Sequence, residues 1–286
     1  MTPFLSASNS FKRLYHLNSN YFGTILVVSI VLMAFFGPML LPVELSTASD
    51  YTTRLQPPSL TYYLGTDGLG RDILPLLFYG LRISLGLSLI AVSLGLCLGA
   101  SLGLTAGYAR GWVDLCVGWV TDILLAFPSI LLAIAIATVM GPGLVSTAIA
   151  VAAVQVPIFA RLSRSLALSI REKPFIDAVR ALGATPLRIL WRHLLPASLP
   201  PLVVQATLAI GTATLEAAGL GFLGLSAQPP TPELGTMVAD AFKNGYAFSS
   251  PWTILSPGLM IMVMVLAFNL FGDELQDRLD PNVKSR

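Results

Sequence analysis

Long apolar runs without charge constrain this chain more than any other feature of its sequence. About 20 helical residues cross a hydrocarbon core about 30 Å thick. Six runs come close to that length or exceed it, and only one of them contains an acid or a base, namely Asp122. We therefore predict an all-α polytopic membrane protein with six transmembrane helices, in the segments 24–41, 83–109, 115–140, 141–160, 194–215 and 254–272. The fourth segment is the least regular, because Pro157 falls near its end.

Composition excludes two other classes of protein. Charged residues make up 11% of the 286 residues, against about 25% in an ordinary soluble domain. A disordered chain needs more charge and fewer apolar residues than this. The net charge is only +2, so no basic face for nucleic acid is expected.

The distribution of Lys and Arg predicts how the chain is oriented in the membrane. If the N-terminus is cytoplasmic, 13 of these residues fall in inside segments and 4 in outside segments. Basic residues favour the cytoplasmic side, so both termini are predicted to be cytoplasmic. We divide the chain into an N-terminal part, 1–82, a five-span core, 83–272, with a cytoplasmic loop at 161–196, and a C-terminal tail, 273–286.

The cytoplasmic loop is predicted to form two short helices. Pro174 at a helix start and Gly183 just after its end are the usual punctuation of a helix. Thr185 is expected to cap a second helix that begins with Pro186 and stops at Pro196. The first helix has an apolar face with little to bury against within one chain, so we expect it to contact either a partner protein or anionic lipid; this face comprises Phe175, Ile176, Val179 and Leu182.

Three motifs then resemble one known family. The sequence Asp-Ala-Val-Arg-Ala-Leu-Gly at 177–183, followed by Ile189 and Leu195-Pro196, resembles the cytoplasmic "EAA" loop of binding-protein-dependent ABC importer permeases. Asp177 stands where that pattern has Glu, and Val179 where it has the second Ala. The motifs at 64–72 and 221–235 resemble the dipeptide, oligopeptide and nickel branch of the family, and most closely its dipeptide permease C subunits.

This resemblance implies a fold, a function and a set of partners. The fold is that of a type I ABC importer permease, and the function is translocation of di- or oligopeptides across the bacterial inner membrane. The partners are a second homologous permease in a heterodimer, two cytosolic ATPase subunits that carry ATP and Mg, and an extracytoplasmic solute-binding protein. The loop would hold the coupling helix that contacts the ATPase, with the residues Phe175, Ile176, Asp177, Ala178, Val179, Arg180, Ala181, Leu182, Gly183, Ile189, Leu195 and Pro196.

The sequence also predicts what this chain does not do. It has no G-x-x-x-x-G-K-[ST] phosphate-binding motif, so we expect no catalysis and no cofactor on this chain, with ATP hydrolysed on a separate subunit. The two histidines, His16 and His193, suggest no metal site. A permease for nickel or a metal chelate stays an alternative, and a stand-alone secondary transporter or channel is a more distant one.

Two further groups of residues have alternative interpretations. The outer motif is either a capped helix start, with Thr66 as the cap, or a contact for the binding protein or the outer gate; it contains Gly65, Thr66, Asp67, Gly70, Arg71 and Asp72. A carboxylate within a span is costly, so it should face the protein interior or water. Glu216 and Asp122 are therefore either paired structural carboxylates or candidates for the pore lining.

Overall fold

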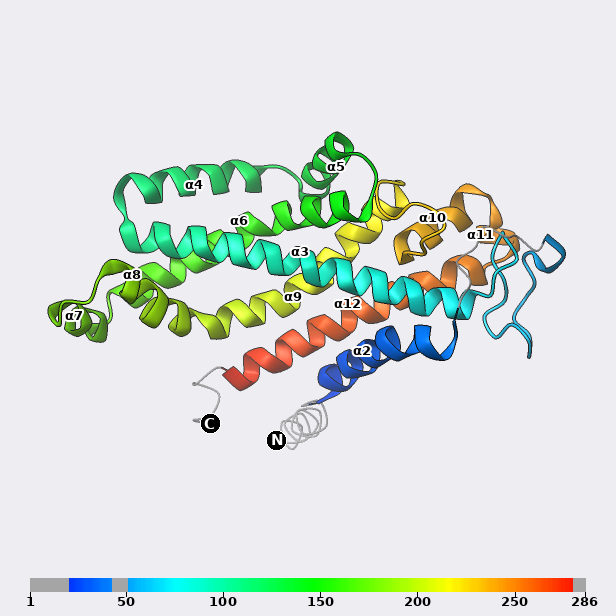
Figure 1. The fold of residues 1–286 in the computed structure, drawn as a ribbon, viewed down its shortest axis with the longest axis horizontal. Helices are drawn as coiled ribbons and strands as arrows, with labels where there is room; N and C mark the ends of the chain where they lie inside the picture. The colour runs from blue at the N-terminus through cyan, green and yellow to red at the C-terminus, as the bar shows by residue number, and fades with distance from the viewer. Residues whose placement is uncertain (1–20, 43–50, 280–286) are drawn as a thin grey trace, which may run out of the picture.

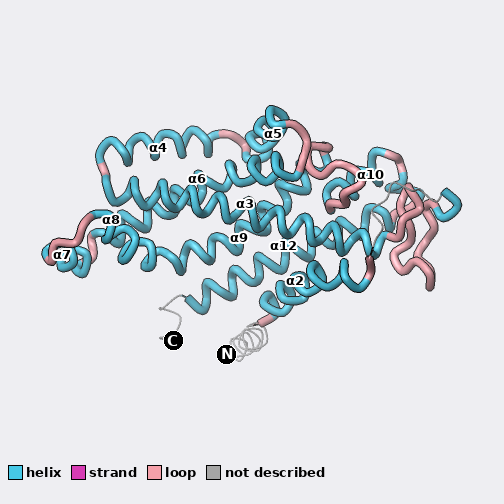
Figure 2. Tube along the Cα trace, viewed as in Figure 1, coloured by secondary structure: helices cyan, strands magenta, loops and turns pink. Residues whose placement is uncertain are grey.

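The computed structural model describes residues 21–42 and 51–279, and this part of the chain is an elongated bundle of helices (Figure 1). Its secondary structure is helical, with one isolated β-bridge between Thr66 and Asp72 and no strand among the described residues (Figure 2). Five helices are long and apolar enough to cross a membrane: α2 (Phe22–Leu40), α3 (Ile73–Ala109), α6 (Leu144–Arg171), α9 (Leu195–Phe222), which continues the helical segment from Pro186, and α12 (Trp252–Leu279). The prediction of an all-α polytopic protein is confirmed.

The third predicted span is not one straight helix. It consists of α4 (Gly111–Ala126) and α5 (Ser129–Met140), which meet at an angle of 95° and bring the number of spans to six only if they are counted together. Phe127 and Pro128 between them have extended backbone conformations. Proline has no N–H for the helix and disfavours helical geometry in the residue before it, so the helix ends here.

The fourth span, which we expected to be the least regular, is continuous. Helix α6 runs through Pro157 to Arg171, well beyond the predicted end at 160. Pro157 is buried in the bundle, whereas Pro128 is exposed. Packing against neighbouring helices therefore holds one proline within a helix, while the other stands at a break.

The second span begins earlier than predicted, at Ile73 instead of residue 83. Asp72 caps it, because its carboxylate accepts a hydrogen bond from Leu74 N at 3.0 Å. Thr66, which we expected to be the cap, lies too far upstream. Arg82 consequently lies within helix α3. The prediction of orientation from Lys and Arg had counted it in an outside segment.

Helices α3 and α6 pack closely along a row of glycines. Gly95, Gly99, Gly103 and Gly107 are spaced four residues apart and face α6. A Cβ on Gly103 would lie 2.1 Å from both Ala160 O and Ser163 Oγ, so no side chain fits there. Small residues at this spacing let two backbones approach closely within a membrane.

The bundle has two chemically different ends. At one end the start of α2 meets the end of α12, where Glu274 accepts hydrogen bonds from Gly23 N at 2.5 Å and Thr24 Oγ1 at 2.7 Å. The same end carries α7 (Pro174–Ala181) and α8 (Pro186–Ile189). The opposite end carries the segment 51–72, α10 (Leu234–Lys243) and α11 (Tyr246–Ser249) (Figure 1).

Candidate functional site

The loop between α6 and α9 folds largely as its helix-start and helix-end residues predict. Pro174 is the first residue of α7, and Gly183 after its end has φ +82°, a conformation that glycine adopts without strain. Asp177 in the first turn accepts a hydrogen bond from Arg180 at 3.0 Å. Thr185 caps α8 by accepting from Arg188 N at 3.3 Å. The predicted pair of short helices is present.

The second of these helices does not stop at Pro196. A π-helical turn, η2 (Leu190–Leu194), joins α8 directly to α9, in which Pro196 occupies the first turn. The loop is therefore continuous with the fifth span.

The apolar face of α7 is divided between two environments. Ile176 is completely buried, and Val179 packs beside it in a cluster with Leu104, Ile170, Ile189 and Leu194. The expectation that this face has little to bury against within the chain is wrong for these two residues, because the ends of α3 and α6 nearest to α7 supply contacts. Four large apolar side chains on the loop remain exposed: Phe175, Leu182, Leu187 and Trp191.

The base of the loop is tied to the end of α3. Arg171, the last residue of α6, donates to the backbone oxygen of Tyr108 at 2.7 Å. Arg110 forms an ion pair with Glu172 just beyond the end of α6. These contacts and the buried cluster hold α7 at a defined position relative to the ends of both helices.

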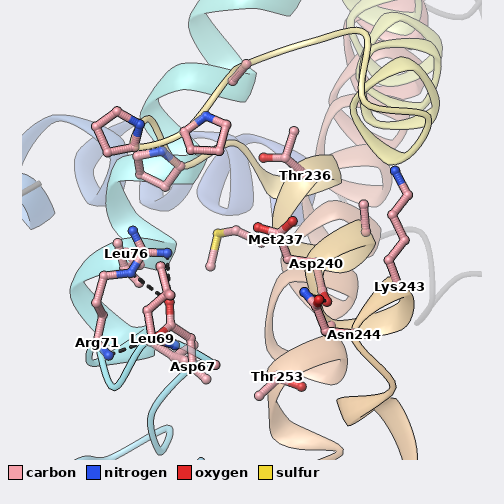
Figure 3. A pocket seen from close by; sticks show the side chains of 18 of the residues that line it. Asp67, Leu69, Arg71, Leu76, Thr236, Met237, Asp240, Lys243, Asn244 and Thr253 are labelled. Carbon is pink, nitrogen blue, oxygen red and sulfur yellow. Dashed lines mark hydrogen bonds and ion pairs between the residues drawn. The ribbon is translucent and has the colours of Figure 1, made fainter. Parts of the chain in front are cut away.

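The opposite end of the bundle contains a cavity of about 610 Å³ between the outer motif and α10 (Figure 3). Asp67 shapes one wall as a tight turn. Its Oδ1 accepts from Leu69 N at 2.8 Å and Arg71 N at 2.9 Å, and its Oδ2 accepts from Arg71 Nε at 2.8 Å. Thr66 is buried, where its hydroxyl accepts from Gln56 N.

The outer motif is therefore largely a structural turn followed by a helix cap. Gly65 and Gly70 have φ of +75° and +80°, which the turn requires of them. The structure explains Thr66, Asp67 and Asp72 by local hydrogen bonds. Two charged residues of this motif, Asp67 and Arg71, line the cavity.

Charges of both signs line this cavity. Asp240 and Lys243 of α10 lie across from Arg71 (Figure 3). Burial raises the pKa of Asp240, while the charges of Arg71 and Lys243 act in the opposite direction. A cavity of this size with a few polar groups is typical of a small-ligand or loop-binding site.

Glu233 is a residue that the sequence analysis missed. It is completely buried and caps α10, where its carboxylate accepts from Gly235 N and Thr236 N, both at 3.0 Å. Ser84 on α3 donates to the same carboxylate at 2.9 Å. Burial raises the pKa of Glu233, and these three donors oppose that shift. An acid immediately before a helix was the available signal.

The acids within the spans differ in their partners. Asp122 on α4 is exposed and pairs with Arg161 at 2.6 Å, and Asp114 near the start of α4 pairs with Arg164, which donates at 2.9 Å. Glu216 on α9 has an amide partner instead, because Gln155 Nε2 donates to it at 3.4 Å. No group of three or more His, Cys, Asp or Glu residues that could hold a metal lies within the described ranges, 21–42 and 51–279.

The fold defines a class of protein. Two solved structures of the methionine ABC transporter MetNI in inward-facing conformations match it, with TM-scores of 0.57 and 0.60 at 23% and 22% sequence identity. They cover 72% and 73% of this chain and 96% and 98% of the matched chains. This is the type I ABC importer permease fold.

Sequence comparisons then identify the family. Residues 99–285 match the family described as binding-protein-dependent transport system inner membrane component, and residues 8–58 match the N-terminal transmembrane domain of oligopeptide transport permease C. The chain belongs to this family of ABC importer permeases, and it is a multi-pass inner-membrane protein.

The similar proteins include peptide permeases of several bacteria. The dipeptide transport system permease protein of Alkalihalophilus pseudofirmus is 48% identical, covering 96% of this chain and 90% of the relative. The glutathione transport system permease protein of Pectobacterium atrosepticum is 42% identical, covering 91% and 85%. The dipeptide transport system permease protein of Haemophilus influenzae is 40% identical, covering 92% and 90%.

Proposed function

We propose that this chain is the permease subunit of an ATP-driven importer for short peptides. Relatives named for dipeptide and glutathione transport match nearly the whole chain. Glutathione is itself a tripeptide, so both names describe solutes of one chemical class. Relatives named for dipeptide or di/tripeptide transport at 48%, 43% and 40% identity support dipeptides as the main solutes.

The observation that carries the ATP-driven mechanism is the divided surface of α7. Its buried side, Ile176 and Val179, is fixed to the ends of α3 and α6, and its exposed side presents Phe175 and Leu182. An exposed apolar patch on a rigid element suits a protein partner. We assign this surface to a cytosolic ATPase subunit, which would carry ATP and Mg, with none on this chain.

The remaining partners follow the same proposal. A second, homologous permease would complete the pore as a heterodimer, and an extracytoplasmic binding protein would deliver the solute. The cavity lined by Arg71, Asp240 and Lys243 is our candidate for the surface that faces this binding protein. Both termini would be cytoplasmic. The start of α2 and the last part of α12 lie together on the side of the bundle that carries α7.

Uptake in cells tests the proposed solute. Cells that lack this chain would be compared with cells in which it is restored, using labelled dipeptide, glutathione and nickel. We expect restored uptake of dipeptide above all. Restored nickel uptake without peptide uptake would contradict the proposal and favour the metal alternative, and uptake that persists without ATP would favour a secondary transporter or channel.

A further inference from the structure

Three polar side chains lie close together where α5, α6 and α9 meet. Glu216 on α9 accepts a hydrogen bond from Gln155 on α6, and Ser129, the first residue of α5, lies beside the same carboxylate. A Cβ on Gly219, one turn further along α9, would lie 3.3 Å from Ile130 Cδ1. The start of α5 therefore packs against this part of α9.

The cluster lies below the outer ends of the helices that build it. Glu216 is six residues before the end of α9, which is about 9 Å along the helix axis. Gln155 is eleven residues after the start of α6, or about 16 Å. Both positions fall within apolar helices that are long enough to span a membrane.

The cluster has more hydrogen-bond acceptors than donors. Gln155 is 1% exposed, and its Oε1 is buried and has no hydrogen-bond partner among the residues that the structure describes. The carboxylates of Asp114 and Asp122 each have an arginine partner, whereas no ion pair to Glu216 occurs among the described residues. A buried acceptor without a donor is costly, and so is a carboxylate in a span without a cation.

A primary ammonium group supplies what this cluster lacks. It carries a positive charge and three N–H donors, enough for the Glu216 carboxylate, Gln155 Oε1 and Ser129 Oγ together. Glu216 is partly exposed and Ser129 is exposed, so a solute can approach from that side, with Gln155 behind. A metal ion suits the cluster less well, because Glu216 belongs to no group of three or more His, Cys, Asp or Glu in the described chain.

We infer that Glu216, Gln155 and Ser129 form a subsite within the membrane for the protonated terminal amine of a peptide. This inference rests on the proposed function and deepens it, because it names the part of the solute that is recognised. It also gives the break between α4 and α5 a role, since the break places Ser129 at the cluster.

Direct binding to the complete importer tests the subsite without the selectivity of the binding protein. The complex of both permeases and the ATPases would be placed in nanodiscs, and binding of labelled Ala-Ala would be compared with that of N-acetyl-Ala-Ala. The wild-type complex should bind the free amine more tightly, and Glu216→Gln should reduce this preference by about tenfold, because a charge-assisted hydrogen bond becomes neutral. Glu216→Asp should retain part of the preference.

Matched controls separate this role from general damage. Asp122→Asn also neutralises a carboxylate in a span, but it should leave the preference unchanged. If Glu216→Gln fails to assemble, Gln155→Leu keeps the carboxylate and removes the unpartnered acceptor together with the amide donor to Glu216, and it should still weaken the preference measurably.

Three results would overturn the subsite. They are a wild-type complex without preference for the free amine, variants at Glu216 and Gln155 that both keep the wild-type preference, and displacement of the label by nickel chloride but not by unlabelled dipeptide. Each of them can occur while restored cells still take up dipeptide. Failure of the subsite is therefore distinguishable from failure of the proposed function.

Discussion

At the scale of single residues, Glu233 shows how one buried side chain can join distant parts of the chain. Its carboxylate is the common acceptor for the start of α10 and for Ser84 on α3. Ser84 Oγ in turn accepts from Leu234 N at 3.2 Å. The segment between α9 and α12 is thereby fixed to the second span.

Replacing Glu233 by Ala should destabilise the protein. Two backbone N–H groups and one hydroxyl would lose their acceptor, and each buried unsatisfied group costs about 1–3 kcal/mol. We expect a lower midpoint of thermal unfolding in detergent, by several degrees or more. Ser249→Ala, a substitution at an exposed residue near the same end, is the control and should leave the midpoint unchanged.

The raised pKa of Glu233 also predicts a pH dependence. Because the folded-state pKa lies above the ordinary glutamate value of about 4.3, this group contributes stability that is fully present below that value and is lost as pH rises through the folded-state pKa. The midpoint of thermal unfolding would be measured at a series of pH values from pH 4 upward. In a plot of midpoint against pH, Glu233→Gln should lose the part of the slope that this group contributes. An unchanged slope would show that Glu233 does not titrate in this way.

At the scale of elements, local signals in the sequence predicted where the loop helices begin and end. The sequence did not predict contacts between distant segments. Pro174, Gly183 and Thr185 act on their immediate neighbours, so the starts and ends of the loop helices were predictable. The burial of Ile176 was not, because it depends on Leu104, which lies far away in sequence, and on the continuation of α6 to Ile170 beyond the predicted end of the span. Glu233 had a local signal, as an acid immediately before a helix, but its partner Ser84 on α3 lies far away in sequence.

The prolines in the spans illustrate this limit. Apolar composition continues on both sides of Pro128 and of Pro157, so hydropathy alone cannot distinguish a break from a continuous helix. Pro157 is buried and Pro128 is exposed, and this difference arises only in the packed bundle. The apolar runs located the spans well, but they could not locate the bend.

The exposed side of α7 should tolerate only small changes if it contacts an ATPase. Ala181→Trp adds a large side chain to this exposed surface, so we expect peptide uptake to fall strongly while the protein level stays normal. The measurements are uptake in cells and ATPase activity of the purified complex. Ala181→Ser keeps the side chain small and should behave like the wild type, and normal uptake by the Trp variant would exclude a tight contact at this position.

The glycine row between α3 and α6 should be equally sensitive. Gly103→Ala places a methyl group within 2.1 Å of Ala160 O, and such overpacking costs about 1–3 kcal/mol. Thermal unfolding in detergent should show the loss. Gly86→Ala lies on the same helix, where no described atom would come within 4 Å of the new methyl group, so it should leave the midpoint unchanged or raise it. Equal midpoints for the two variants would contradict the close packing.

At the scale of the whole molecule, the two ends of the bundle should differ in their accessibility from outside the cell. In a chain without its native cysteines, Cys97→Ser and Cys116→Ser, single cysteines can be introduced at exposed positions. Phe248→Cys on α11 should react with a membrane-impermeant thiol reagent in intact cells. Leu187→Cys on α8 should react only after permeabilisation, and the reverse pattern would invert the proposed orientation.

The glycine row has a mechanical consequence for the whole molecule. Helix α3 extends over 37 residues, about 55 Å, and the interlocked backbones leave α6 no space to slide along it. The two helices therefore form one rigid unit, with α7 fixed near one end and the outer cavity near the other. We therefore expect a displacement of α7 to reach the opposite end of the bundle as a tilt of both helices together.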